Sequence, residues 1–427
     1  NFTTATNSYN TAVGANAGTA VTTGVENTLI GGLAGDALTD ADLNVAVGHK
    51  ALGADTLGSR STAIGFAALE DQNFTTATNS YNVAVGALAG TNVTTGTLNT
   101  LIGGLTGDAL TEGAENVAMG VNALGGDTKG SFSTALGGNA LQTQNFTTAT
   151  NVYNTAVGFA AGKLVTTGVQ NVLIGGLAGD ALTDADTNVA VGVGSLGADT
   201  LGSNSVAVGS YALTAQNFTT ATDTYNTAVG HAAGNAVTTG IQNTLIGGLA
   251  GDALTDADRN LAIGYSALGA DTLGSDSVAI GANTLRVQNF TTATSSYNTA
   301  VGSNAGRNIS TGINNVLIGG LAGDALTDAD YNTSVGGANL SSDTLGSKST
   351  AIGYGVLVTQ NFTTATDSYN TAVGYNAGTA VTTGIQNTFI GGLAGDALTD
   401  ADYNTAIGVI ALGSDTLGSR STVMGYG

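Results

Sequence analysis

The chain has no cysteine, no proline and no tryptophan, and it has few charged residues. Without cysteine it can form neither a disulfide nor a thiolate metal site. Only 9% of its 427 residues are charged, a fraction typical neither of an ordinary enzyme nor of a disordered tail. Nine Lys and Arg against 30 Asp and Glu give a formal net charge of −21, which repels nucleic acid and anionic lipid. The sequence therefore predicts no nucleic-acid partner.

Long hydrophobic runs are also missing. No apolar stretch has the length of a membrane-spanning helix, and the first residues, Asn1-Phe2-Thr3, lack the basic and apolar character of a signal peptide. We therefore expect no membrane insertion in this segment, and we expect any export signal or anchor to lie outside it. What the chain has instead is 66 glycines and a hydrophobic fraction of 42%, enough to form a core from small side chains.

The main signal is an internal repeat with a period of 72 residues. The segment Asn-Phe-Thr-Thr-Ala-Thr begins at residue 1 and returns at residues 73, 145, 217, 289 and 361. We therefore interpret residues 1–427 as a single continuous domain. Its repeats are 1–72, 73–144, 145–216, 217–288, 289–360 and 361–427.

Each repeat contains four copies of a shorter unit, an Asn or Ser followed by three mostly apolar residues and a glycine. In the first repeat these units are Asn10-Thr11-Ala12-Val13-Gly14 and the units that open at Asn27, Asn44 and Ser61. Successive openings lie 17 residues apart, and the next one, Asn82, follows after 21 residues. Four short coils per repeat predict 24 coils in the chain.

The five-residue unit predicts an all-β fold, a parallel β-solenoid. Its glycine suits a corner that needs a positive φ or a close backbone approach, and no 3.6-residue periodicity indicates helix. Stacked coils would place the opening Asn and Ser side chains in hydrogen-bonded ladders.

The direction of the side chains in each unit follows from the alternation of a strand. With the bulky fourth residue directed into the coil, the second residue also points inward and the third points outward. Because an outward row without charge suits protein contact better than water, we expect the third position to contact another chain. In the first repeat this position is occupied by Ala12, Leu29, Ala46 and Ala63.

The units resemble those of a known group of fibrous proteins. Asn10-Thr11-Ala12-Val13-Gly14 and Ser277-Val278-Ala279-Ile280-Gly281 are similar to the coil motif in the heads of trimeric autotransporter adhesins. They resemble as closely the repeats of phage tail fibres and related bacterial surface proteins that end in an endosialidase-type chaperone domain. The resemblance covers the whole chain, although the coils here are longer than those of the adhesin heads. It implies a left-handed parallel β-roll, three chains side by side, and attachment to a surface.

The second coil of each repeat contains a glycine-rich acidic turn, which is a candidate calcium site. Residues 31–42 are close to the calcium-binding nonapeptide of parallel β-rolls, with Ala34 in place of its third glycine. The alternative is a solvated acidic turn, and no other cofactor is predicted. The candidate ligands are Asp36, Asp40, Asp108, Glu112, Asp180, Asp184, Asp252, Asp256, Asp324, Asp328, Asp396 and Asp400.

Other polar and aromatic residues favour structural roles. An Asp followed by Thr recurs in the third coil, first at Asp55, and we expect it to bond its own backbone and shape a turn. His49 and His231 fall in different coils, so neither completes a repeated catalytic triad. In the 21-residue coil, Phe2 and Tyr9 are expected to fill a corner, with a binding surface as the alternative. No catalytic residue is predicted.

These observations predict a structural or adhesive extracellular fibre, on a cell surface or a virion, and not an enzyme. Such a fibre would be a repetitive rod for attachment or spacing. We expect a homo-oligomer, a trimer by resemblance, with a surface receptor or glycan as a further partner. The alternative is a self-polymerising filament or sheath subunit of an extracellular structure.

Overall fold

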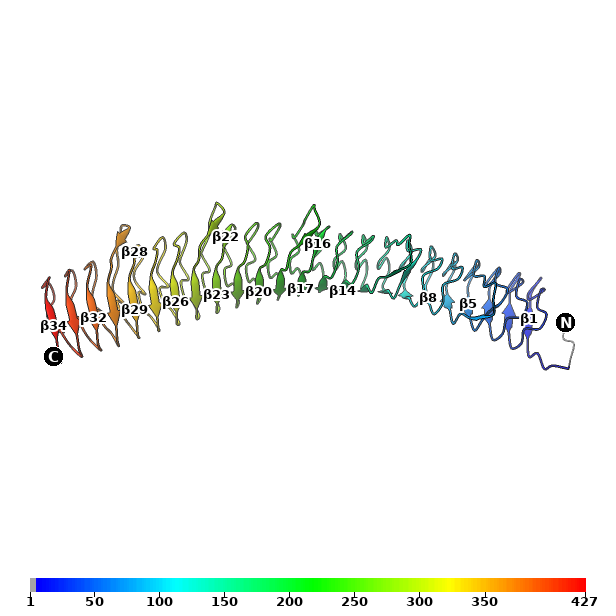
Figure 1. Ribbon diagram of the computed structural model, residues 1–427, viewed down its shortest axis with the longest axis horizontal. Helices are drawn as coiled ribbons and strands as arrows, with labels where there is room; N and C mark the ends of the chain where they lie inside the picture. The colour runs from blue at the N-terminus through cyan, green and yellow to red at the C-terminus, as the bar shows by residue number, and fades with distance from the viewer. Residues whose placement is uncertain (1–4) are drawn as a thin grey trace. The chain divides into compact units, whose positions relative to one another are not determined.

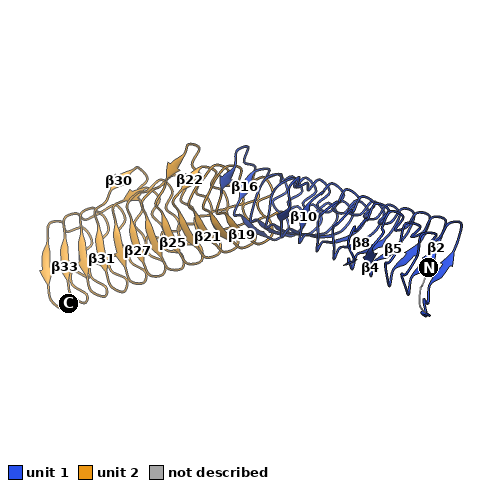
Figure 2. Ribbon diagram, turned by 45° about the vertical axis from the view of Figure 1, so that its right-hand side comes forward, with its two compact units in different colours: residues 1–210, 217–223 blue, residues 211–216, 224–427 orange. Residues whose placement is uncertain are grey.

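The computed structural model describes residues 5–427, and all regular secondary structure in that range is β-strand. The chain forms two compact units, unit 1 with residues 5–210 and 217–223, and unit 2 with residues 211–216 and 224–427 (Figure 2). Each unit is a parallel β-solenoid of twelve coils, and each coil contributes one main strand of three residues. The all-β parallel solenoid expected from the repeat is thereby confirmed.

Unit 1 has twelve main strands and six two-residue strands. Its main strands are β1 (Thr11–Val13), β2 (Thr28–Ile30), β3 (Val45–Val47), β5 (Thr62–Ile64), β7 (Val83–Val85), β8 (Thr100–Ile102), β9 (Val117–Met119), β11 (Thr134–Leu136), β13 (Thr155–Val157), β14 (Val172–Ile174), β15 (Val189–Val191) and β17 (Val206–Val208). Its two-residue strands are β4 (Gly58–Ser59), β6 (Thr78–Asn79), β10 (Gly130–Ser131), β12 (Thr150–Asn151), β16 (Gly202–Ser203) and β18 (Thr222–Asp223).

Unit 2 repeats this plan. Its main strands are β19 (Thr227–Val229), β20 (Thr244–Ile246), β21 (Leu261–Ile263), β23 (Val278–Ile280), β25 (Thr299–Val301), β26 (Val316–Ile318), β27 (Thr333–Val335), β29 (Thr350–Ile352), β31 (Thr371–Val373), β32 (Thr388–Ile390), β33 (Thr405–Ile407) and β34 (Thr422–Met424). Its two-residue strands are β22 (Gly274–Ser275), β24 (Thr294–Ser295), β28 (Gly346–Ser347) and β30 (Thr366–Asp367).

Within each unit the main strands lie side by side in one parallel sheet (Figure 1). Equivalent residues of successive coils are opposite each other: Leu29 of β2 faces Ala46 of β3, and Ala46 faces Ala63 of β5. Because the register does not shift, each position of the five-residue unit forms a continuous row along the stack. The rows that point outward are therefore the side chains exposed to solvent or to another molecule.

The third position of the unit points into the coil, so the prediction that it faces outward is wrong. Leu29, Ala46 and Ala63 are at most 1% exposed, whereas the fourth-position side chain Ile30 is 39% exposed. Ala12 is exposed because β1 is the first strand of the stack: among the described residues it pairs with β2 on one side and with no strand on the other. The interior is narrow: an added Cβ at Gly35 would lie 2.8 Å from both Leu29 and Leu38. Alanine therefore fits inside, and the larger β-branched side chains lie outside.

Two other expectations from the unit are confirmed. Gly31 has a φ of 137°, and a Cβ there would lie 2.4 Å from the backbone oxygen of Gly48, so both the corner conformation and the close approach exclude a side chain. The opening Asn side chains form a buried ladder. The Asn27 Oδ1 atom accepts a hydrogen bond of 3.0 Å from the backbone nitrogen of Asn44, whose Nδ2 donates to the Gly58 oxygen at 2.9 Å.

The longer, 21-residue coil forms an insertion, which the structure describes in the first residues of the second and later repeats. Its two-residue strand pairs with that of the preceding coil, as β6 does with β4, where Thr78 lies opposite Gly58. In Figure 1, β22 and β28 of unit 2 stand on the side of their coils opposite the main strands. The insertion is therefore a local extension of the coil that leaves the register of the main sheet unchanged.

Candidate functional surfaces and sites

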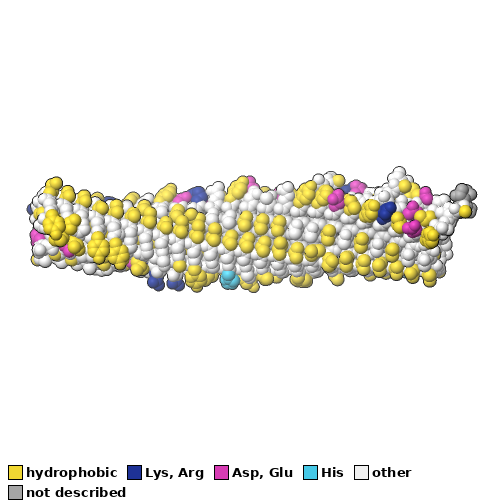
Figure 3. All heavy atoms as spheres, turned by 90° about the horizontal axis from the view of Figure 1, so that it is seen from below, with side chains coloured by type: hydrophobic (Ala, Val, Ile, Leu, Met, Phe, Trp, Pro, Cys, Tyr) yellow, Lys and Arg dark blue, Asp and Glu magenta, His cyan; other side chains and the backbone are white. Residues whose placement is uncertain are grey.

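The outer face of the main sheet carries no charge in its two central rows, of which one is mostly Thr and Val and the other is apolar. One row is formed by the second residue of each unit, Thr, Val or Leu, and the other by the fourth residue, Val, Ile, Leu or Met. Ile64, Ile174 and Ile390 of the second row are 38%, 38% and 41% exposed. Figure 3, viewed from the side of the main strands, shows hydrophobic side chains in such rows. We call this face the outer sheet face.

A third row, which we call the edge row, consists of the residue immediately before the opening Asn or Ser of each coil. Its backbone is left-handed throughout, with φ between 49° at Tyr9 and 65° at Arg60. Side chains of adjacent coils contact each other along it. The Arg60 guanidinium lies 5.7 Å from the Tyr81 ring centroid, and the rings of Phe132 and Tyr153 stack at 5.2 Å. Unlike the outer sheet face, the edge row carries charged and aromatic groups.

The acidic turns of the second coil do not gather into a multidentate site. Asp40 accepts a hydrogen bond from the Thr23 hydroxyl, Asp184 accepts one of 2.6 Å from Thr167, and Glu112 pairs with Lys129 at 2.9 Å. Nowhere in residues 5–427 do three or more acidic or histidine side chains come together as metal ligands. Equivalent acids also recur once in four coils, about 19 Å apart at the usual strand spacing, so two repeats cannot share an ion.

The first acid of the turn is partly buried. Burial raises the pKa of Asp108, Asp180, Asp252 and Asp324, and the Oδ1 atom of Asp324 has no hydrogen-bond partner. Calcium takes six to eight oxygen ligands, whereas each turn offers two or three carboxylates. The second is already hydrogen-bonded or ion-paired in the copies described above, and the third, Asp42 in the first repeat, accepts a hydrogen bond of 2.8 Å from the backbone nitrogen of Val25. The donor set fits calcium poorly, and the calcium site stays a prediction.

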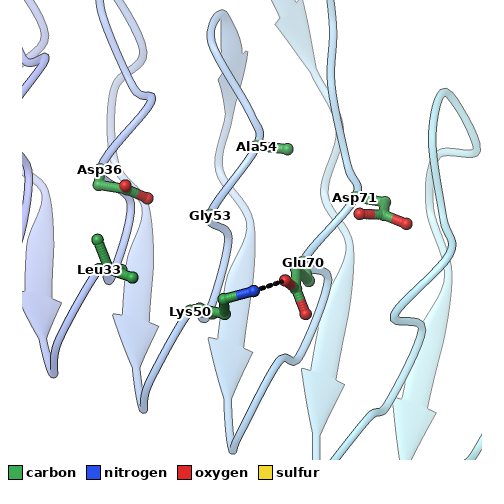
Figure 4. Close-up of a pocket in the computed structure, with 7 residues that line it drawn as sticks. All are labelled: Leu33, Asp36, Lys50, Gly53, Ala54, Glu70 and Asp71. Carbon is green, nitrogen blue, oxygen red and sulfur yellow. Dashed lines mark hydrogen bonds and ion pairs between the residues drawn. The ribbon is translucent and has the colours of Figure 1, made fainter.

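A shallow hollow of about 230 Å³ lies next to the first acidic turn, between the second, third and fourth coils (Figure 4). Asp36, Glu70 and Asp71 line it, and the Lys50 ammonium bridges to Glu70 at 2.6 Å. The hydrogen bond to Glu70 raises the pKa of Lys50. The corresponding hollow of the second repeat has Asn122 in place of Lys50, so the ion pair is not a repeated feature.

The recurring Asp of the third coil is the centre of a buried polar network. The Asp55 Oδ1 atom accepts hydrogen bonds from the backbone nitrogens of Gly58, at 3.0 Å, and Phe74, at 3.2 Å. Its Oδ2 atom accepts one of 2.6 Å from Gln72, whose Oε1 accepts one of 2.8 Å from Asn82. The expected bond from Asp55 to its own turn is confirmed.

This network, which we call the aspartate–glutamine node, recurs with the repeat. Gln144 donates to Asp127 at 2.6 Å and Gln288 donates to Asp271 at 2.6 Å. Burial raises the pKa of Asp55 and Asp127, while the hydrogen bonds from glutamine and backbone act in the opposite direction. Asp55 is fully buried and both its oxygens accept hydrogen bonds, so it fixes the insertion to the preceding coil and offers no atom to a substrate.

Sequence reasoning missed the glutamine of the node. Its signal was present, because Gln72, Gln144, Gln216, Gln288 and Gln360 each precede the Asn-Phe-Thr of the next repeat. A buried carboxylate needs hydrogen-bond donors, and a glutamine recurs at a fixed sequence distance after this Asp in each of the first five repeats. The Asp–Gln hydrogen bond could therefore have been predicted.

The two aromatic residues of the insertion behave differently. Phe74 is 6% exposed, which confirms the packing role for this position, although Phe2 itself lies outside the described residues. Tyr81 is 49% exposed and Tyr9 is 71% exposed, so the expectation that the tyrosine fills a corner is wrong. The tyrosine belongs to the edge row, where its ring is available to a partner.

The two histidines lie apart, and each contacts an aromatic ring. His49 stacks on Phe66 with centroids 5.8 Å apart, and His231 meets the edge of Tyr211 at 6.5 Å. As expected, they form no common site.

Comparisons with known proteins place the chain in no established group. No family model matches it, and no curated protein matches its sequence. Among the described residues, no helix has the length and apolar character needed to cross a membrane.

Proposed function

We propose that this chain is a structural or adhesive module of an extracellular fibre, in which copies of the chain associate through the outer sheet face. The observation that carries the proposal is the exposed apolar row of fourth-position side chains on that face, with Ile30, Ile64 and Ile174 each between 38% and 39% exposed. The second-position row beside it is uncharged and consists mostly of Thr and Val. Monomeric soluble proteins rarely expose contiguous apolar patches larger than a few hundred Å². A row repeated without charge over twelve coils is therefore best explained by a second copy that covers it.

Charge supports a partner of this kind. Charged side chains occupy the edge row and the acidic turns, whereas the two central rows have none. Copies that meet face to face would therefore bury no unpaired charge, which would otherwise cost several kcal/mol. The resemblance to adhesin heads and tail fibres implies that the assembly is a trimer.

A non-catalytic role agrees with the distribution of titratable groups. The fully buried Asp55 is held by backbone and glutamine donors, and the acids of the second-coil turn recur once per repeat rather than forming a single constellation. Six tandem copies suit a fibre better than an active site.

The mass of the assembly in solution tests the proposal. Replacing Ile30, Ile64 and Ile174 with Asp puts three charges on the outer sheet face of unit 1, and we expect the assembly to dissociate in analytical ultracentrifugation. The control variant replaces Thr75, Thr147 and Thr219 with Asp, which adds the same charge to exposed positions of the insertion. An unchanged mass for the isoleucine variant, or a monomeric wild-type chain, would refute association through this face.

A further inference from the structure

The edge row contains a residue choice that the fold does not explain. In the first coil of every repeat the edge-row residue is tyrosine. These residues are Tyr9, Tyr81, Tyr153, Tyr225, Tyr297 and Tyr369. In the second coil of the same repeats it is Glu26, Leu98, Gln170, Gln242, Asn314 and Gln386. The third and fourth coils vary as widely. One position of the coil therefore holds the same residue in every repeat, while its three equivalents change freely.

Neither the backbone nor the core requires this tyrosine. The edge row is left-handed at every coil, with φ of 51° at Tyr81 and 61° at Leu98, so the conformation does not select an aromatic ring. Burial does not select it either, because Tyr153, Tyr225 and Tyr297 are 51%, 56% and 58% exposed.

Contacts within the chain also fail to account for it. The edge-row neighbour on the preceding coil is Arg60 for Tyr81, Phe132 for Tyr153, and Lys348, at 5.1 Å from the ring centroid, for Tyr369. The neighbour changes from a cation to an aromatic ring while the tyrosine stays. Contacts along the edge row therefore do not explain the tyrosine.

The insertion that leads to each tyrosine is similarly uniform. Thr75, Thr76 and Ala77 are exposed, and the same three residue types recur at the equivalent exposed positions of every described repeat. Two residues before the tyrosine stands a side chain that can hydrogen-bond but whose charge varies, such as Asn79, Asp223 or Ser295. The shared chemistry is an exposed ring with hydroxyl groups and no common charge.

We propose that these tyrosines, with the adjoining insertion, bind a neutral polysaccharide, with one contact in each repeat. An aromatic face packs against the C–H groups of a sugar ring, and hydroxyl or amide groups bond its hydroxyls. An anionic polymer would be repelled by the net charge of −21, and no cation is common to the repeats. The inference rests on the proposed attachment role and supplies the class of ligand.

The spacing favours a polymer over a single sugar. Successive tyrosines of one unit are four coils apart, about 19 Å at the usual strand spacing. Each contact is weak, but contacts on one chain act together, so the apparent affinity rises steeply with their number. Loss of one aromatic contact should weaken binding about 2- to 10-fold, and loss of all of them should abolish it.

Affinity electrophoresis through gels that contain a neutral polysaccharide tests the proposal. The probes are dextran, mannan, laminarin and hydroxyethyl cellulose, with dextran sulfate as the anionic comparison. We expect one of the neutral polymers to retard the assembled wild-type protein. The first variant replaces the six first-coil tyrosines of the edge row with Ala and should migrate without retardation. Its matched control, L98A/Q170A/Q242A/N314A/Q386A, changes the same row in the second coils and should be retarded as the wild type is.

A six-residue Tyr→Phe variant separates the ring from the hydroxyl. It should keep most of the retardation, because the ring face is the contact, and circular dichroism should be the same for all variants since the tyrosines are exposed. Equal retardation of the alanine variant and its control, retardation by dextran sulfate alone, or none by any neutral polymer would overturn the proposal. Sedimentation of the same variants distinguishes failure of this inference from failure of the proposed function. If sugar binding is lost while the assembly stays intact, the proposed fibre role still stands.

Discussion

The aspartate–glutamine node makes a quantitative prediction about local stability. Replacing Gln72 with Leu removes the 2.6 Å hydrogen bond to Asp55, the 2.8 Å bond from Asn82 and the 3.0 Å contact with Ser61. The Asp55 carboxylate is then buried with one oxygen unpartnered, which costs more than a lost neutral bond. A charged hydrogen bond contributes about 1.5–3 kcal/mol and a neutral one about 1 kcal/mol, so loss of the bonds to Asp55 and from Asn82 predicts a local loss of about 2.5–4 kcal/mol.

Hydrogen exchange is the suitable assay, because a repeat protein opens locally and a single unfolding free energy does not describe it. The amide protons of Gly58 and Phe74 bond to Asp55, so their exchange protection should fall about 100- to 1000-fold in the variant. The equivalent amides of Gly130 and Phe146 in the next repeat should keep theirs.

The control for this experiment is Gln142→Leu, which changes a partly exposed glutamine of the same unit and should leave both sets of amides protected. Unchanged protection at Phe74 in the Gln72 variant would mean that the node does not hold the insertion, and the reasoning would be refuted.

Four further predictions concern pH, ions, an unpartnered buried hydroxyl and a tight corner of the coil. Burial raises the pKa of Asp55 above its unfolded value, so the contribution of Asp55 to stability is complete below the unfolded pKa, about 3.9, and is lost as pH rises through the folded pKa. The urea midpoint of the wild type should therefore rise relative to that of Asp55→Asn as pH falls from neutral. A fall of the wild-type midpoint relative to the variant would contradict the direction of the pKa change. If the second-coil acids bind calcium, a chelator at constant ionic strength should lower the melting temperature. Because the donor set fits calcium poorly, we expect no effect of the chelator but stabilisation by monovalent salt. Ser334 is buried at a position that is mostly Ala or Leu elsewhere, and its hydroxyl lacks a partner, so Ser334→Ala should stabilise its coil by about 1 kcal/mol in denaturant unfolding. Gly31→Ala, whose Cβ would lie 2.4 Å from the Gly48 oxygen, should cost more than about 1 kcal/mol, while Gly32→Ala, with 3.5 Å to its nearest neighbour, should be close to neutral in the same measurement.

The sequence alone was sufficient for the solenoid, because its determinants are local. The coil length follows from the spacing of Asn27 and Asn44, and the closing glycine follows from a corner that admits no Cβ. The Asn ladder follows from stacking identical side chains in register. Each of these properties depends on one coil and its neighbour, so repetition in the sequence maps directly onto repetition in space.

The contents of the outer surfaces were harder to predict, because they depend on the width of the coil. The assumption that Ile30 must be inside follows the general preference of large apolar side chains for a core, but that preference holds only where the core has room. The exposure of Tyr81 was missed for a related reason, since an aromatic residue was expected to fill space that Phe74 already fills.

The ladder itself contained the information needed to orient the strand. If the Asn27 side chain bonds inside the stack, it must point inward, and strand alternation then places Leu29 on the same side and Ile30 on the other. Asn27 and Ile30 cannot both point inward within one short strand, because they lie three positions apart and side chains alternate between the two faces. The buried polar row therefore determines the direction of every apolar row. In solenoids of this kind, the polar residue that needs a hydrogen-bond partner predicts which side chains of the strand point inward better than the largest hydrophobic residue does. A buried amide without a partner costs free energy, whereas an exposed isoleucine can be covered by another chain.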